Sequence, residues 1–344
     1  MSSTSPSHPL IIGHRGAPGY RPEHTRAAFE LAFALGADAV EPDLVATKDG
    51  VLVIRHENEI SGTTDVASRP EFAARETTKI VNGVVRNGWF SEDFTWAELS
   101  TLRARERRPS IRRSSASFDG RFPLLRLRDL FEICDAAAES SQRWRGMVAE
   151  IKFATYFESI GLPLDELFID EVKNAGWDDG DGRLIVESFE RDVLVKVEER
   201  GIRAKRIYLV EDSGAPFDEV NRHGTLAADY AASLTEEGLY ALAGKVDGIS
   251  VNKSLILAND DSGRVAGTTD LVDDAHAAGL EVYTWTLRPE NKFLSQPFRR
   301  GTGRADFGDW QGEFQTIMST GIDGVFADYP DLAVSVREEL ELVE

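Results

Sequence analysis

Short apolar runs alternate with helical patterns along most of the chain. The expected strands that contain these runs are five to seven residues long, which is typical of buried strands and too short for helices. The strands that we expect lie at 10–14, 39–44, 51–56, 146–152, 184–189, 206–210, 248–252, 281–286 and 324–328. We expect the runs at 10–12, 39–40 and 51–54 to form buried parallel strands, so the polar residues that follow them lie near strand carboxyl ends.

The segments between these strands have the spacing of amphipathic helices. The helices that we expect lie at 23–35, 164–175, 191–200, 270–278 and 312–319. A helix, a small residue, a glycine and a strand follow one another repeatedly, as at 277–282, and such a glycine commonly ends a helix. About eight of these units favour an α/β fold of the (β/α)8 TIM-barrel type over an open sheet. No Gly/Ser/Pro-rich linker divides the chain, so we expect residues 1–344 to form a single barrel domain.

Two segments interrupt the alternation. Residues 57–122 have few strand signals and are expected to form a small insertion after the second βα region. A basic tract in this insertion has six arginines, at 103, 105, 107, 108, 112 and 113. They either bind phosphate or form a solvated surface loop, and the acidic chain around them favours the loop. Residues 288–312 are rich in Gly and Pro and predict a long loop after the seventh strand, a type of loop that often shapes an active-site mouth.

The composition narrows the choice of partners. The 344 residues carry a formal net charge of −20 and are 42% hydrophobic. This charge argues against nucleic acid or an anionic membrane as a partner, although a local cationic cleft could still bind a small anion. No segment reaches the roughly 18 apolar residues of a membrane span, so we expect no integral membrane contact. Cys134 is the only cysteine and is expected to be a buried thiol.

The amino terminus bears on localisation. Residues 1–9 have neither a basic segment nor an apolar stretch. The sequence as printed therefore predicts a cytoplasmic protein. A periplasmic or secreted protein is the alternative if a signal has been removed.

Acidic side chains at strand ends predict a metal site. Glu41 and Asp43 are two residues apart on one strand and so leave the same face, and Glu150 and Lys152 repeat that spacing. Three carboxylates in one barrel mouth do not all stay ionised without a cation, although any one alone is commonly a salt-bridge or capping residue. Oxygen ligands favour a hard ion, so the expected cofactor is one divalent cation, Ca²⁺ or Mg²⁺.

Two of the six histidines lie at the carboxyl ends of expected apolar strands. His14 and His56 are therefore the candidates for a general acid and a general base. Arg15 offers a bidentate fork to a phosphate, and Lys152 offers a second positive charge. Together these residues predict metal-assisted cleavage of a phosphoester.

A series of short sequence motifs, which we call phrases, lies in order over nearly the whole chain. The series resembles the glycerophosphodiester phosphodiesterase family. The phrases are His14-Arg15-Gly16-Ala17, Pro22-Glu23-His24-Thr25, Glu41-Pro42-Asp43-Leu44, Thr47-Lys48-Asp49-Gly50, His56-Glu57, Glu150-Ile151-Lys152, Glu187-Ser188-Phe189, Trp285-Thr286 and Phe326-Ala327-Asp328-Tyr329-Pro330. The phrase with His24 and the long insertion are most similar to the bacterial periplasmic branch.

The resemblance implies a barrel with one small insertion and gives each residue a role. It implies a divalent cation on Glu41, Asp43 and Glu150, an acid/base pair of His14 and His56, phosphate contacts from Arg15 and Lys152, and substrate contacts from Glu23, Phe189 and Trp285. From the sequence, a first-turn helix acid is the alternative role for Glu23, with the site role favoured, and a core position is the alternative for either aromatic residue. The implied reaction converts a glycerophosphodiester, such as glycerophosphocholine or glycerophosphoethanolamine, to sn-glycerol 3-phosphate and an alcohol.

Other functions remain open at this point. A lysophospholipase D or a sphingomyelinase-D-like enzyme would favour an exposed apolar or basic rim near the mouth, for which Phe293, Leu294, Phe298 and Trp310 are the apolar candidates. A non-catalytic phosphoester-binding barrel would not need two histidines. The expected partner is a small-molecule substrate, and a homodimer is left open. Which histidine is the acid, and whether water or a substrate hydroxyl attacks first, is not readable from the sequence.

Overall fold

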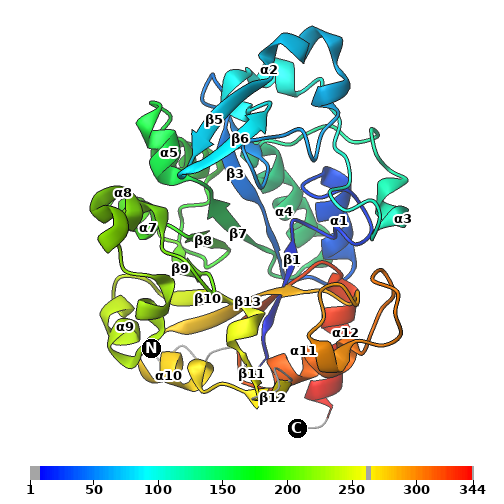
Figure 1. The fold of residues 1–344 in the computed structure, drawn as a ribbon, viewed down its shortest axis with the longest axis vertical. Helices are drawn as coiled ribbons and strands as arrows, with labels where there is room; N and C mark the ends of the chain where they lie inside the picture. The colour runs from blue at the N-terminus through cyan, green and yellow to red at the C-terminus, as the bar shows by residue number, and fades with distance from the viewer. Residues whose placement is uncertain (1–7, 261–264, 343–344) are drawn as a thin grey trace.

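The computed structural model describes residues 8–260 and 265–342, and it contains a closed barrel of parallel strands surrounded by helices (Figure 1). The barrel strands, in chain order, are β1 (Leu10–His14), β2 (Ala39–Glu41), β7 (Gly146–Ile151), β8 (Leu184–Ser188), β9 (Lys205–Val210), β10 (Gly248–Asn252), β13 (Glu281–Leu287) and β14 (Gly324–Ala327). The ring closes because β2 pairs with both β1 and β7. The prediction of a TIM barrel is confirmed.

Helices cover the outside of the barrel. They are α1 (Arg26–Ala34), α4 (Leu127–Ser141), α5 (Ala154–Ser159), α6 (Leu164–Ala175), α7 (Arg191–Glu199), α8 (Phe217–His223), α9 (Glu236–Leu242), α10 (Leu271–Ala277), α11 (Trp310–Met318) and α12 (Pro330–Glu341). The predicted glycine ends are well illustrated by α6, which stops at Gly176 in the left-handed conformation, with a φ of 71°. Cys134 is fully buried on the inner face of α4, as expected.

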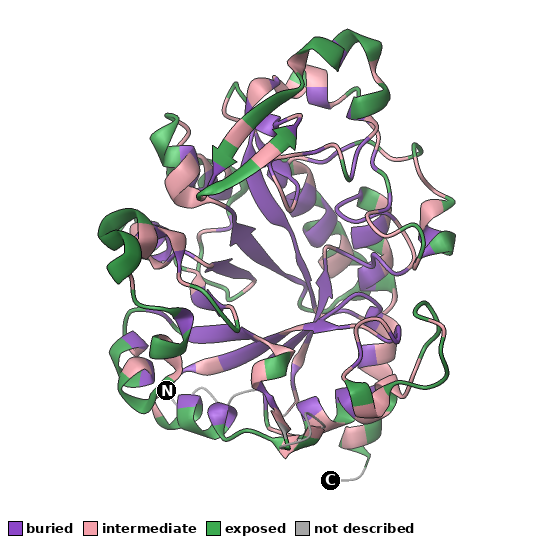
Figure 2. Ribbon diagram, in the orientation of Figure 1, coloured by how far each residue is buried: buried purple, intermediate pink, exposed green. Residues whose placement is uncertain are grey.

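The strand side chains alternate between two cores. Ile12, Val148, Ile185, Ile207 and Phe326 belong to a small cluster that also includes Ala39 and Tyr283. Their neighbours along the strands belong to the larger cluster, which also includes helix side chains. This period of two is the strand geometry that packs one set of residues inside the barrel and the other beneath the helices. Figure 2 shows the barrel strands as almost continuously buried.

One expected parallel strand is antiparallel. After β2, the chain passes Pro42 and continues as β3 (Asp43–Ala46), which pairs in parallel with β7. The apolar run at 51–54 forms β4 (Leu52–Ile54), which returns antiparallel to β3 and lies outside the barrel ring. The sequence prediction was wrong here because a short apolar run does not specify strand direction. The reversal still carries His56 back to the strand ends, since the Arg55 N–H donates to the Asp43 carbonyl at 2.9 Å.

Residues 57–122 lie between β4 and α4. They contain the antiparallel hairpin of β5 (Thr77–Val81) and β6 (Val84–Gly88) and the short helices α2 (Trp96–Leu99) and α3 (Arg113–Ala116). The hairpin and α2 lie at the top of Figure 1, and Figure 2 shows that much of the hairpin is exposed. A second hairpin, of β11 (Leu257–Asn259) and β12 (Val265–Thr268), follows β10. Short 3₁₀ turns occupy Val66–Ser68, Pro70–Arg75, Ser91–Asp93, Gly224–Leu226, Tyr230–Leu234, Lys253–Leu255 and Gln296–Phe298.

The long loop predicted after the seventh strand runs from the end of β13 to the start of α11. The amino-terminal residues that carry the prediction of a cytoplasmic protein lie outside the described residues, apart from His8 and Pro9. Within the described ranges, none of the helices combines the length and the apolar character that crossing a bilayer requires.

Candidate active site

A cavity of about 520 Å³ lies at the strand carboxyl ends and collects most of the predicted site residues. Its lining includes His14, Arg15, Glu41, His56, Glu150, Lys152, Phe189 and Trp285. Asp43 lies next to the cavity beneath Lys152, with 3.4 Å between Asp43 Oδ1 and Lys152 Nζ. Glu23 lines a smaller adjoining cavity instead. The strand ends therefore bring the predicted residues together, with Glu23 at one side.

The turn after β1 places Arg15. Arg15 and Gly16 both have positive φ values, 57° and 91°, which make the chain turn sharply toward α1. A Cβ atom on Gly16 would lie 2.6 Å from the backbone carbon of Ala28, so only glycine fits. In this turn the Arg15 N–H donates to Glu41 Oε2 at 2.8 Å. The turn thus orients a carboxylate of the site as well as the guanidinium group.

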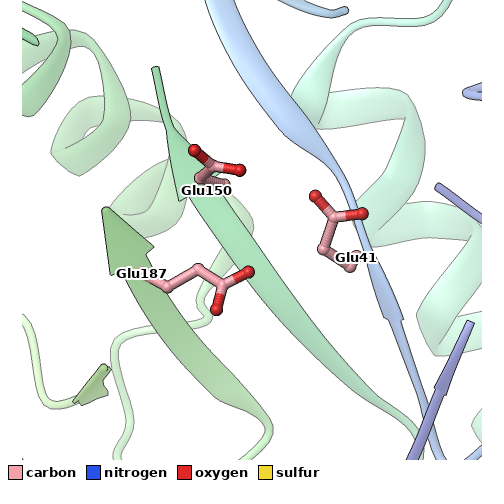
Figure 3. Close-up of side chains that lie close together, drawn as sticks. All are labelled: Glu41, Glu150 and Glu187. Carbon is pink, nitrogen blue, oxygen red and sulfur yellow. The ribbon is translucent and has the colours of Figure 1, made fainter. Parts of the chain in front are cut away.

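Three glutamates that line the cavity lie close together (Figure 3). Glu41 comes from β2, Glu150 from β7 and Glu187 from β8, and one ligand oxygen from each lies within 4.8 Å of the others. Glu150 and Glu187 are partners in the strand register. Figure 3 shows Glu150 and Glu187 on adjacent strands, with Glu41 across from them. We call Glu41, Glu150 and Glu187 the carboxylate cluster.

The electrostatics of the carboxylate cluster suit a bound cation. Burial raises the pKa of Glu150 to about 8, and burial with nearby carboxylates raises the pKa values of Glu41 and Glu187 well above the ordinary range. Glu187 Oε2 is buried without a hydrogen-bond partner. Buried acids in this state bind a hard divalent cation through their oxygens, which keeps them ionised. The donor set therefore fits the predicted Ca²⁺ or Mg²⁺.

Asp43 lies beside the carboxylate cluster. Its Oδ2 contacts His24 Nε2 at 2.7 Å, and its buried Oδ1 has no hydrogen-bond partner. Burial raises the pKa of Asp43, but His56 and Lys152 outweigh this effect and lower it below its usual range. Lys152 Nζ also lies 2.7 Å from Glu150 Oε1. Asp43 is thus ionised and keeps one oxygen available for a ligand.

His14 is held by an aspartate from the other end of the chain. Its Nδ1 lies 2.6 Å from Asp328 Oδ1, after β14. Burial raises the pKa of Asp328, but Arg112 and Arg288 outweigh this effect and keep it ionised. Burial and Arg15 lower the pKa of His14 to about 3, so its imidazole is neutral. An ionised Asp328 accepts the Nδ1–H, which leaves Nε2 of His14 as the basic nitrogen.

His56 has the same arrangement with an adjacent glutamate. Its Nδ1 lies 2.6 Å from Glu57 Oε1. Burial opposes ionisation of Glu57, but hydrogen bonds from His56 and Arg107 lower its pKa far below the usual value. Burial, Arg15 and Lys152 lower the pKa of His56 to about 4. Each histidine is therefore a neutral imidazole with its Nδ1–H held by a carboxylate.

Two of the six arginines at 103–113, Arg107 and Arg112, are not solvated, contrary to the expected surface loop, whereas Arg105 and Arg113 are exposed as that expectation requires. Arg107 donates to both oxygens of Glu23 at 2.7–2.9 Å and to both oxygens of Glu57 at 2.7–2.8 Å. Arg112 is buried and donates to Glu290 at 2.7 Å and to Asp328 at 2.5 Å. These pairs join residues far apart in sequence, so composition alone could not identify them. Glu23, for which the resemblance implies a substrate contact, pairs with Arg107 and Arg15.

The two predicted aromatic residues form one wall of the cavity. Phe189 and Trp285 pack edge to face, with ring centres 5.9 Å apart. Lys152 Nζ lies 5.6 Å from the centre of the Phe189 ring. An apolar wall beside a cationic group suits a ligand that has both a carbon skeleton and a phosphate.

Sequence reasoning did not assign roles to four residues that build this site. Glu57, Glu187 and Asp328 lie in phrases that carried the family resemblance, and Glu187 follows an apolar run as Glu150 does. That parallel was a usable signal for Glu187. Arg107 had no such signal.

Comparison with known proteins decides the family. The model of the glycerophosphoryl diester phosphodiesterase family matches residues 14–332. The chain belongs to this family. It is 29% identical over 335 residues to the glycerophosphodiester phosphodiesterase GDPD6 of Arabidopsis thaliana, covering 94% of this chain and 84% of the relative. It is 25% identical to the glycerophosphodiester phosphodiesterase of Haemophilus influenzae, covering 95% and 89%. The chain is accordingly an enzyme, a phosphoric diester hydrolase.

Solved structures of family members share the fold. A phosphodiesterase of Oleispira antarctica, solved in complex with the product sn-glycerol-3-phosphate, has a TM-score of 0.60 and 20% identity, covering 96% of this chain and 97% of that one. A glycerophosphodiester phosphodiesterase of Agrobacterium tumefaciens has a TM-score of 0.57 and 16% identity, covering 95% and 99%. At these identities the likeness supports the fold.

Proposed function

We propose that this enzyme hydrolyses glycerophosphodiesters to sn-glycerol 3-phosphate and an alcohol, with a divalent cation and with His14 and His56 as the acid/base pair. The observation that carries the proposal is the placement of two carboxylate-held imidazoles and the carboxylate cluster in one cavity. The product named for the Oleispira antarctica neighbour is the one expected here.

The proposed cation ligands are Glu41, Asp43 and Glu150, with Glu187 as a fourth acidic group. The unpartnered oxygens of Asp43 and Glu187 support this set. A divalent cation bound there would polarise a phosphoryl oxygen and offset the charge that develops on phosphorus. The choice between Ca²⁺ and Mg²⁺ is left to the experiment.

The other residues bind and orient the diester. The guanidinium group of Arg15 and the ammonium group of Lys152 would contact non-bridging phosphate oxygens. Phe189 and Trp285 would pack against the glycerol carbons. Because the diester is an anion, its arrival raises the pKa of the nearby imidazoles and lets one of them hold a proton.

Proton transfer at the two Nε2 atoms completes the reaction. One neutral imidazole removes a proton from the attacking oxygen, which forms a bond to phosphorus. The other gives its proton to the alcohol oxygen as its bond to phosphorus breaks. In one route the attacking oxygen belongs to water. In the other it belongs to a hydroxyl group of the glycerol, which forms a cyclic phosphate that water then opens. Both routes use the same residues.

A lipid substrate has less support. Leu294, one of the expected rim residues, is buried, and Phe293 has cationic groups around its ring. Phe298 and Trp310 are half-buried. These four residues supply no exposed apolar rim, and only the cationic groups around Phe293 would form a basic one, so a soluble glycerophosphodiester suits the site better than a lysolipid.

The test measures sn-glycerol 3-phosphate released from glycerophosphocholine, with and without EDTA, and then with Ca²⁺ or Mg²⁺ added back. We expect activity to disappear with the chelator and to return with one of the ions. Lysophosphatidylcholine and sphingomyelin serve as parallel substrates. Cleavage of the lipids but not of the diester would contradict the proposal, and so would activity that survives complete removal of metal.

A further inference from the structure

Four cationic side chains surround one aromatic ring at the edge of the active-site cavity. Arg108, Arg112, Arg288 and Lys292 place their charged groups 5.1, 5.8, 4.9 and 5.4 Å from the ring centre of Phe293. We call these four side chains the cationic cluster. Two come from the segment at 57–122 and two from the loop after β13. Such a concentration of positive charge is unexpected in a chain with a net charge of −20.

Nearby carboxylates neutralise only part of the cationic cluster. Arg112 pairs with Glu290 and Asp328, and Arg288 donates to Asp328 at 2.5 Å. In the described part of the chain, no carboxylate lies within ion-pair distance of Arg108 or Lys292. Burial and the neighbouring Arg288 lower the pKa of Arg108, consistent with uncompensated like charges. The cationic cluster therefore has positive charge available for an anion.

The cationic cluster adjoins the proposed reaction centre. Arg108 and Arg288 line the main cavity together with His14 and His56, and both also line the smaller cavity beside it. Arg288 and His14 bind different oxygens of the same carboxylate, Asp328. An anion at Arg108 and Arg288 would thus lie close to a diester held by Arg15 and Lys152.

We propose that Arg108 and Arg288 bind a second anionic group, carried on the alcohol of the substrate. The preferred substrates are then glycerophosphodiesters whose alcohol carries a phosphate. This inference rests on the proposed function and deepens it by naming the substrate class. Arg108 is expected to bind the second anionic group most strongly, because its guanidinium group has no carboxylate partner among the described residues. Arg288 positions the anion from the other side while holding Asp328.

The test compares two substrates that differ by one phosphate, glycerophosphoglycerol and glycerophosphoglycerol phosphate. Loss of the diester signal in ³¹P NMR gives kcat/KM for each. We expect the wild-type enzyme to prefer the phosphorylated substrate. Arg108→Gln should reduce that preference about ten- to hundredfold, the range for a hydrogen bond between charged groups. Arg108→Lys should retain much of the preference, since it keeps the charge.

Two controls separate local binding from general attraction. Arg86 also lines the cavity, but it lies against Phe153, 5.9 Å from the ring centre. If the positive charge of the cavity attracted the second phosphate only over a long range, Arg86→Gln would reduce the preference for the phosphorylated substrate as much as Arg108→Gln does. Arg113 is exposed outside the cavity, so Arg113→Gln should leave the ratio of the two kcat/KM values unchanged.

Each outcome decides the inference. Equal losses on both substrates in Arg108→Gln, or no wild-type preference, would overturn the second anion site while leaving diester hydrolysis intact. Failure to cleave any glycerophosphodiester with either ion would overturn the proposed function and, with it, this inference. Circular dichroism of each variant checks that it folds.

Discussion

The strand ends of the barrel and the segment at 57–122 contribute different groups to one site. The strand ends contribute the carboxylate cluster, three buried acids on neighbouring strands. The segment contributes Arg107 and Arg112, each bound to two carboxylates. The barrel thus supplies the groups proposed to hold the cation, whereas the segment fixes the carboxylates that hold the histidines. Metal binding and imidazole orientation are assigned to different regions of the molecule.

The largest expected effect comes from the histidines, which both regions orient. His14→Ala and His56→Ala should each lower kcat by about two to four orders of magnitude, the usual range for general acid/base catalysis. Neither substitution should change the affinity for the divalent cation, because the carboxylate cluster is intact. Steady-state kinetics and calorimetric metal titration check the two parts. Retention of more than a tenth of wild-type kcat would remove that histidine from its proposed role.

The second prediction concerns the ion pairs that Arg112 of the segment forms with residues at the strand ends of the barrel. Arg112→Met leaves Glu290 without its guanidinium partner, and Asp328 keeps only Arg288 and His14. Removing one member of a buried ion pair costs about 3–5 kcal/mol of the free energy of unfolding. Urea unfolding followed by fluorescence measures the change. The neighbouring exposed Arg113→Met is the matched control, and a loss below about 1 kcal/mol in Arg112→Met would show that the pair is not needed.

The third prediction concerns the barrel acids alone. Glu187→Gln and Asp43→Asn should each weaken Ca²⁺ or Mg²⁺ binding by at least about tenfold, because ligand charge sets the affinity for these ions. Glu190→Gln is the control, since Glu190 lines the same cavity but its carboxylate is bound to Thr155. Unchanged affinity in Glu187→Gln would exclude it as a ligand and leave Glu41, Asp43 and Glu150. Unchanged affinity in Asp43→Asn would limit Asp43 to orienting His24 and Lys152.

The two regions also differ in how far the sequence predicts them. The barrel follows from short-range patterns: alternating apolar runs and helices, and acids directly after strands such as Glu150. Two features of the barrel were missed: the place of Glu187 beside Glu150, for which only its apolar run gave a local signal, and the direction of β4, which depends on pairing across strands. Glu187 lies opposite Glu150 in the register, and β4 runs antiparallel to β3. Neither the register nor the direction of a short run is encoded locally.

The segment at 57–122 was less predictable because its contacts join distant parts of the chain. Arg107 meets Glu23 and Glu57, which are 84 and 50 positions away, and Arg112 meets Asp328, 216 positions away. An arginine in such a pair has the same local surroundings in sequence as a solvated one. The family phrases located His14, His56 and Asp328, but not the arginines that keep the carboxylates ionised.

The smallest expected effect tests whether the exposed hairpin of this segment matters to the fold. Val85 lies on β6 with 67% of its surface exposed, so Val85→Thr removes little buried apolar area. Threonine keeps the β-branched shape that strands favour, and the free energy of unfolding should change by no more than about 0.5 kcal/mol. The same urea titration used for Arg112→Met measures it. A loss of 2 kcal/mol or more would mean that the outer face of the hairpin is covered in solution, and the segment would then contribute a contact surface as well as the arginines of the site.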